Sequence, residues 1–243
     1  CLIYRDSSLL SFTISSLLAV GIFLSYVPQH VRIYQRQTSE GISPFFLLLG
    51  TMSGFSALLN VVMLTQMLRD CCSSLSWFDC ANSQLGLIQV AAQATAAALI
   101  LVLCVHFTRG SPFQMLAEYA KLVSIYRVCS AYLLVSAIFV IYPLVWAPGL
   151  VTPVANFQGL FATVLASIQY FPQIYTTWRL KHAGSLSMNM MLIQTPGGFL
   201  WATTMILRPG SVWSTWLPYL AAASLQAVLL SLCVWFSITK PIE

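Results

Sequence analysis

The chain has 243 residues, of which 58% are hydrophobic and only 7% are charged, and its formal net charge is +5. Roughly 25% of the residues of an ordinary soluble domain are charged, and so few charges cannot cover the surface of a soluble domain of this length. The composition therefore predicts an integral membrane protein, because lipid tolerates an apolar exterior. It also argues against nucleic acid as a partner, since no basic cluster is long enough to follow a phosphate backbone.

Charged residues divide the chain into apolar stretches, and a membrane-spanning helix needs about 20 residues. Five stretches hold one span each, and the longest, 128–178, holds two on either side of the turn-forming segment 146–149. The first span is interpreted as a span and not as a signal peptide, because its apolar run is too long and no Ala-x-Ala cleavage site follows. Cys1 is not a natural start, so we expect the chain to be trimmed at its N-terminus. In chain order, we expect spans at about residues 8–31, 43–67, 83–107, 128–147, 153–177, 186–207 and 213–237.

The connections between these spans form two sets that carry unequal positive charge. The N-terminal tail and every second connection after it hold three basic residues, whereas the other set holds eight. This excess predicts that the second set faces the cytosol, so that the N-terminus is luminal or extracellular and the C-terminus is cytosolic. The eight are Arg32, Arg36, Arg109, Lys121, Arg127, Arg179, Lys181 and Lys240, and the three are Arg5, Arg69 and Arg208.

Three cysteines lie in the predicted luminal connection between the second and third spans. A disulfide can persist in that compartment, so Cys80 is expected to pair with either Cys71 or Cys72. A zinc site is not expected, because that connection contains no histidine. The other cysteines within spans are expected to act as small apolar side chains: Cys104, Cys129 and Cys233.

The chain contains an internal repeat. The segment 25–29 (Ser-Tyr-Val-Pro-Gln) matches 169–173 (Gln-Tyr-Phe-Pro-Gln), and the Ser43 and Ser187 that follow have the same offset of 144 residues. The first helices of the two copies are the first and the fifth spans, four crossings apart, so both copies have the same orientation in the membrane. We therefore predict an all-α membrane protein of seven transmembrane helices, arranged as two parallel three-helix repeats joined by a linker helix. The first repeat is expected at 1–109, the linker at 110–150 and the second repeat at 151–243.

Each copy contains a Pro-Gln pair near the cytosolic end of its first span. A proline inside a helix donates no N–H and clashes with the carbonyl four residues earlier, which is freed. The Gln29 that follows Pro28, and the Gln173 that follows Pro172, supply both a donor and an acceptor. We interpret both pairs as hinges, because they occupy matched positions; the alternative is a fixed kink with a Gln at the membrane edge.

These pairs, each followed by a short Ser- and Gly-rich element, resemble the PQ-loop repeat family. That family includes cystinosin-like and vacuolar or lysosomal cationic amino-acid transporters, with SWEET carriers and KDEL receptors as distant relatives. The resemblance implies alternating access about the prolines, a solute site between the bundles, and a vacuolar or lysosomal membrane. Two departures argue against proton coupling. Gln194 stands where cystinosin-like proteins have an Asp. In the second span, residues 50–53 lack the acidic residue that the cationic amino-acid transporters have there.

No acid lies within a span, so we expect neither an enzyme nor a metal or cofactor site. Uncharged polar residues near the second repeat's motif are the candidates for solute binding. Pro196 is expected to break the sixth span and expose backbone groups, and Trp201 is expected either to pack against the solute or to face lipid. The predicted substrate-binding residues are Asn156, Gln169, Gln194, Gly197, Gly198 and Trp201.

Together, these features predict a membrane transporter of a small polar solute, an amino acid or a similar molecule. The alternative is a cargo receptor or membrane scaffold of the KDEL-receptor type, which would place charged residues in a luminal cavity. The identity of the solute, the direction of flux, the oligomeric state and the exact organelle are left open. So is proton coupling, for which Glu40 is the alternative coupling acid.

Overall fold

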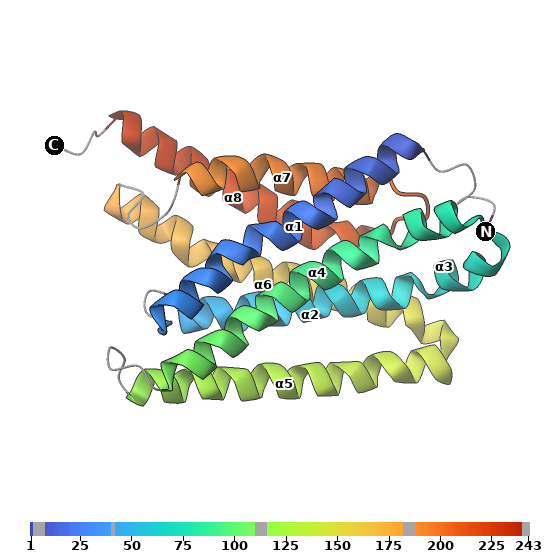
Figure 1. Ribbon diagram of the computed structural model, residues 1–243, viewed down its shortest axis with the longest axis horizontal. Helices are drawn as coiled ribbons and strands as arrows, with labels where there is room; N and C mark the ends of the chain where they lie inside the picture. Colours follow the sequence, from blue (N-terminus) through green and yellow to red (C-terminus); the bar gives the residue numbers. More distant parts are fainter. Residues whose placement is uncertain (2–7, 40–41, 110–115, 182–187, 240–243) are drawn as a thin grey trace.

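The computed structural model is a bundle of helices that run between two ends of the molecule (Figure 1). It describes residues 1, 8–39, 42–109, 116–181 and 188–239. Short 3₁₀ turns, η2 (Cys72–Ser74) and η3 (Pro148–Leu150), join some of the helices. The helices are α1 (Leu9–Arg36), α2 (Pro44–Leu64), α3 (Gln66–Cys71), α4 (Trp77–Thr108), α5 (Leu116–Val145), α6 (Val151–Leu180), α7 (Met188–Ile206) and α8 (Trp213–Thr239).

Among the described residues, six helices are long and apolar enough to cross a membrane: α1, α2, α4, α5, α6 with the turn before it, and α8. Helix α7 is not one of the six. It has 19 residues, and its polar residues, with a proline and two glycines, lower its hydropathy. The apolar composition and these helices agree with the prediction of an integral membrane protein.

Local sequence signals explain several helix ends. Ser43, a residue of the repeated motif, caps α2 by accepting a hydrogen bond from the Phe46 N–H, and Pro44 occupies the first helical position. At the other ends, α1 stops at Gln37 and α6 at Lys181, both in the left-handed conformation with φ of 51° and 59°. These two positions differ by the repeat offset of 144, so the two copies share their helix ends as well as their motifs.

Helix α5 begins well before the span expected at 128–147. Its first turns, from Leu116 onward, contain Glu118, Lys121 and Arg127. Charged residues are good helix formers outside lipid, so the helix extends beyond the apolar segment that the charge pattern marks.

The same packing order occurs in both halves of the molecule. Helix α4 packs extensively against both α1 and α2, which scarcely contact each other. Helix α8 packs in the same way against α6 and α7. The third helix of each half therefore lies between the first and the second, as expected for two copies of one unit.

A matched pair of glycines allows these close contacts. A Cβ added at Gly54 would lie 3.5 Å from the Cα of Ala94 on α4, and one added at Gly198 would lie 3.1 Å from the Cβ of Ala223 on α8. Small residues at helix interfaces permit such an approach in membranes. The two glycines are again 144 residues apart, so the internal repeat extends into the second helix of each copy.

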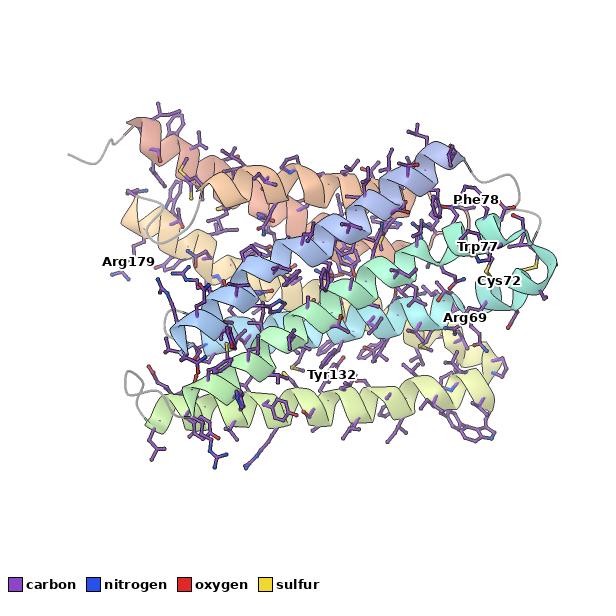
Figure 2. The ribbon with its side chains drawn as sticks, viewed as in Figure 1. Arg69, Cys72, Trp77, Phe78, Tyr132 and Arg179 are labelled. Atoms are coloured by element: carbon purple, nitrogen blue, oxygen red, sulfur yellow. A yellow bond between two sulfur atoms is a disulfide. The ribbon has the colours of Figure 1, made fainter. Side chains whose placement is uncertain are left out.

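Helix α5 lies at one edge of the bundle and contacts both halves (Figure 1). The hydroxyl of Tyr132, labelled in Figure 2, lies 2.6 Å from Ser56 Oγ on α2 and donates to Gln158 Oε1 on α6 over 3.1 Å. One tyrosine thus anchors α5 to a helix from each half.

The two ends of the bundle differ in chemistry. The N-terminus, α3 and Arg69 lie at one end, and Arg179 lies at the other (Figures 1 and 2). Cys72 pairs with Cys80, one of the two pairings expected, whereas Cys71 pairs with Cys1. The bond between Cys1 and Cys71 was not predicted, because the two cysteines are 70 residues apart in sequence. We call this disulfide-bearing end the N-terminal end.

Candidate functional site

Trp201 of α7 lies in the interior of the bundle, where it contacts side chains of α4 and α8. Its side chain is buried, its ring lies 4.2 Å from the ring of Tyr219 between centroids, and its Nε1 donates to Gln89 Oε1 over 3.1 Å. Of the two orientations that the sequence left open for Trp201, the structure has the inward one.

Gln89 connects this tryptophan to the other half of the molecule. It is completely buried, and its Nε2 donates to the backbone carbonyl of Ser15 on α1 over 2.8 Å. Ser15, Gln89 and Trp201 therefore form a chain of hydrogen bonds from α1 through α4 to α7. Sequence analysis missed Gln89, although its spacing of one turn from Gln93 within an apolar span was an available signal.

Three tyrosines interact with one another near this chain. Tyr26 of α1 hydrogen-bonds Gln93 of α4 and interacts electrostatically with Tyr170 of α6 and with Tyr219 of α8, which packs on Trp201. The Tyr219 hydroxyl is buried and has no hydrogen-bond partner among the described residues. Aromatic faces with a few convergent polar groups are typical of small-molecule sites. Tyr26 and Tyr170 belong to the two repeated motifs, but attention to the Pro-Gln pairs left them out of the predicted site.

A second group of polar contacts joins α2 to α6. Gln169 donates to the Phe46 carbonyl over 3.4 Å, Ser53 to the Ala162 carbonyl over 2.9 Å, and Asn60 to the Ala155 carbonyl over 2.7 Å. From Phe46 to Asn60 these bonds span about 21 Å of helix. Gln169, predicted to bind solute, thus lies in an interface between the two halves, where a Cβ at Gly50 would be 3.1 Å from its Nε2.

The remaining predicted residues are distributed over several surfaces. Gln194 accepts a hydrogen bond from Gln226 over 3.1 Å, which joins α7 to α8 within the second half. Asn156 is near the start of α6, and its Oδ1 is buried without a partner among the described residues. None of the described atoms of neighbouring elements lies within 4 Å of a Cβ added at Gly197. The structure therefore does not gather Asn156, Gln169, Gln194, Gly197, Gly198 and Trp201 into one site.

The expected break in the sixth span is wrong, because α7 continues through Pro196 from Met188 to Ile206. A proline is tolerated inside a membrane helix when neighbouring groups compensate for the missing bond. Pro28 and Pro172 likewise lie inside the continuous helices α1 and α6. Whether these two Pro-Gln pairs act as hinges stays a prediction.

One histidine near the first pair has a specific contact. The Nε2 of His30, directly after Gln29, lies 2.9 Å from the Ala96 carbonyl of α4. His30 therefore fastens the end of α1 to α4. Among the described residues, no three His, Cys, Asp or Glu side chains come together as metal ligands would.

Comparison with known proteins matches the repeat to a family. The model of the PQ-loop repeat family matches the chain twice, over residues 10–70 and 154–214. The chain belongs to the PQ-loop repeat family. The two matches include α1 with α2, and α6 with α7, and they are 144 residues apart, as the motifs are. A similar protein is the uncharacterized protein C4C5.03 of Schizosaccharomyces pombe (strain 972 / ATCC 24843), 30% identical over 250 residues, which cover 93% of this chain and 80% of that protein.

Proposed function

We propose that this PQ-loop protein is a seven-span transporter that moves an amino acid or a similar small polar solute by alternating access. In this proposal α7 is the seventh span, α1, α2 and α4 form one unit, α6, α7 and α8 form the other, and α5 links them. The observation that carries the proposal is an asymmetry between the two interfaces that join the units.

Two equivalent interfaces are expected from the repeat. If α1 corresponds to α6 and α2 to α7, the contact of α2 with α6 corresponds to that of α7 with α1. The first contact is the most extensive in the molecule, whereas the second is slight. Figure 1 shows that α1 and α7 cross near the N-terminal end and diverge toward the opposite end.

Side chains explain why the two interfaces differ. Gln169, Ser53 and Asn60 supply the three hydrogen bonds between α2 and α6. The residues at the corresponding positions between α1 and α7 are Ser25, Gly197 and Thr204. The hydroxyl of Ser25 donates to a carbonyl of its own helix, as does that of Thr204, and Gly197 has no side chain.

Each such interhelical bond contributes about 0.6 kcal/mol on average in a membrane. Three bonds then favour the interface between α2 and α6 by about 2 kcal/mol, which corresponds to a factor of roughly 30 in population. We infer that α2 and α6 form a fixed interface and that α1 and α7 open and close. In the structure, the chain from Ser15 through Gln89 to Trp201 joins α1, α4 and α7 toward the N-terminal end, and α1 and α7 diverge beyond it.

The orientation of this state follows from two arguments. Disulfides persist in a lumen or outside the cell, and the larger set of basic residues favours the cytosol. Both support a luminal N-terminal end, so the protein would be open toward the cytosol here. The vacuolar or lysosomal location rests on the family resemblance. Among the described residues, Asp79 and Glu118 lie only in the first turns of α4 and α5 and no acid lies deeper in a span, which supports transport that follows the solute gradient without proton coupling.

Exchange in proteoliposomes tests the proposal. Vesicles that contain the purified chain are loaded with unlabelled amino acids, and entry of labelled amino acids and glucose is measured one at a time. Exchange of an amino acid is expected. If a solute binds the purified chain but is never exchanged, the transporter proposal fails and the cargo-receptor alternative is favoured.

Cross-linking tests the moving interface. A disulfide between cysteines at Ser53 and Ala162, across α2 and α6, is expected to leave exchange unchanged. A disulfide between cysteines at Leu18 and Gly197, the corresponding positions of α1 and α7, is expected to abolish exchange until it is reduced. The opposite result would show that α2 and α6 are the helices that move.

A further inference from the structure

An arginine lies beside the closed contact of α1 with α7 and has no acidic partner among the described residues. Arg208 follows α7, and its Nη2 lies 3.4 Å from the hydroxyl of Ser15 on α1. Its Nη1 is buried and has no hydrogen-bond partner among the described residues. The guanidinium is therefore only partly satisfied, although it reaches from one half of the molecule to the other.

The backbone of α4 makes room for this group. A Cβ at Gly86 would lie 2.5 Å from Nη1 of Arg208, so any larger residue there would displace the guanidinium. Gly86 is one turn before Gln89, the residue that joins Ser15 to Trp201. Arg208 is thus held next to the hydrogen bonds that close the N-terminal end.

Within the part of the chain that the structure describes, no acid compensates this positive charge. The acids among the described residues are Asp70 in α3, Asp79 in the first turn of α4 and Glu118 in the first turn of α5. Burial lowers the pKa of the Arg208 guanidinium to about 10, so the group remains charged at neutral pH. Arg208 is half-buried and its Nη1 is buried without a partner among the described residues, so its positive charge carries a desolvation cost, and an anion supplied by a bound molecule would reduce that cost.

We propose that Arg208 binds the carboxylate of the transported solute, and that this charge excludes solutes with a net positive charge. The inference rests on the proposed function and narrows the substrate class to neutral or acidic amino acids. A guanidinium binds a planar carboxylate through two parallel N–H bonds. Separation of α1 from α7 breaks the single bond to Ser15 and leaves both terminal nitrogens facing the solute, with the hydroxyl of Ser15 beside them.

Exchange in proteoliposomes tests the charge preference. Neutral or acidic amino acids are expected to exchange and lysine is not. The primary amide of an exchanged amino acid, which lacks the carboxylate, is expected to compete about 10- to 100-fold more weakly than the acid, as loss of a charged hydrogen bond predicts. Equal exchange of lysine, or equal competition by the amide, overturns the inference but leaves the transporter proposal standing.

Variants assign the effect to one side chain. Arg208→Gln is expected to raise the KM of the amino acid about 10- to 100-fold and to remove the preference for the acid over the amide. Arg208→Lys is expected to keep part of this preference. The matched control is Arg69→Gln, which removes an exposed arginine at the same end that donates to the Val62 carbonyl. If Arg208→Gln still discriminates acid from amide, or if Arg69→Gln loses this discrimination as well, Arg208 serves the fold and not the solute.

Binding without transport gives an independent measurement. Thermal unfolding in detergent is followed with the amino acid, with its amide, and with anionic phospholipid. Stabilisation by the amino acid that disappears in Arg208→Gln supports the inference even where wild-type vesicles show no exchange. Stabilisation by the phospholipid alone, lost in the same variant, would identify a lipid phosphate as the occupant and overturn it.

Discussion

Substitutions at two adjacent glycines of α7 should distinguish an effect on folding stability from an effect on helix movement. Gly198 packs on Ala223, with 3.1 Å between an added Cβ and the alanine methyl, whereas Gly197 has nothing within 4 Å. Ser53 occupies the repeat position of Gly197, and it contacts α6. Gly197 is therefore expected to face α1 when α1 and α7 close. We predict that a larger side chain in place of Gly198 impairs folding, whereas a larger side chain in place of Gly197 impairs transport.

The size of the effect on stability follows from the geometry. Replacing a glycine in a helix by alanine gains up to about 1 kcal/mol, and this is the whole effect expected for Gly197→Ala. For Gly198→Ala the gain is opposed by overpacking, which costs about 1–3 kcal/mol, since α7 and α8 must separate by a few tenths of an ångström. The two variants should differ by about 1–3 kcal/mol, or about 2–12 °C in Tm for a chain of this size.

Leucine at the same positions separates the two roles further. Gly197→Leu is expected to unfold near the wild-type temperature in detergent and to lose solute exchange in proteoliposomes, because its side chain keeps α1 and α7 apart. Gly198→Leu is expected to lower the yield of folded protein. If Gly197→Leu exchanges solute at the wild-type rate, Gly197 faces lipid in every state, and the assignment of α1 and α7 as the moving interface is refuted.

Three further predictions concern the interface, the hinge and the disulfides. Asn60→Leu removes two hydrogen bonds together with an unpartnered oxygen and should lower the free energy of unfolding by about 1–2 kcal/mol. Asn60→Asp buries an uncompensated carboxyl group and should lower it by more than about 3 kcal/mol. A higher Tm for Asn60→Asp than for Asn60→Leu would contradict the contacts of Asn60. Pro172→Leu should slow exchange more than it lowers folded yield, and a wild-type rate would exclude the hinge. Peptide mapping under non-reducing conditions should recover Cys1 joined to Cys71, and a peptide that joins Cys71 to Cys80 would contradict this pairing.

The arrangement of the helices was largely predictable, because it depends on local signals. Charged residues mark the apolar segments, and the Pro-Gln pairs together with Ser43 reveal the repeat. The break expected at Pro196 was wrong because a helix that is packed on a neighbour accommodates a proline, and this packing is invisible in one sequence. For the same reason, the early start of α5 could not be read from the apolar segment alone.

The site was predicted less well, because it depends on contacts between helices that are far apart in sequence. Trp201 was chosen for its position after the glycine pair, but its partner Gln89 lies 112 residues away. Arg208 was counted only as one of the basic residues that set orientation. Its contact with Ser15 bridges 193 residues, and no periodicity within one span indicates it. Sequence patterns locate polar residues within spans, and only packing decides which of them meet.

Comparison of the two repeats distinguishes residues that maintain the shared fold from residues that give each unit its own chemistry. Residues that are equal at the offset of 144 support the shared geometry, since both units need the same bends and close helix contacts. They include Tyr26 with Tyr170, Pro28 with Pro172, and Gly54 with Gly198. Residues that differ at this offset give each interface its own chemistry: Trp201 corresponds to Ala57 and Arg208 to Leu64. One unit thus supplies the buried tryptophan and the uncompensated charge, and the other supplies Ser15 and Gln89. A solute held between them would contact unequal surfaces, so two copies of one unit can bind an asymmetric molecule such as an amino acid in a single orientation.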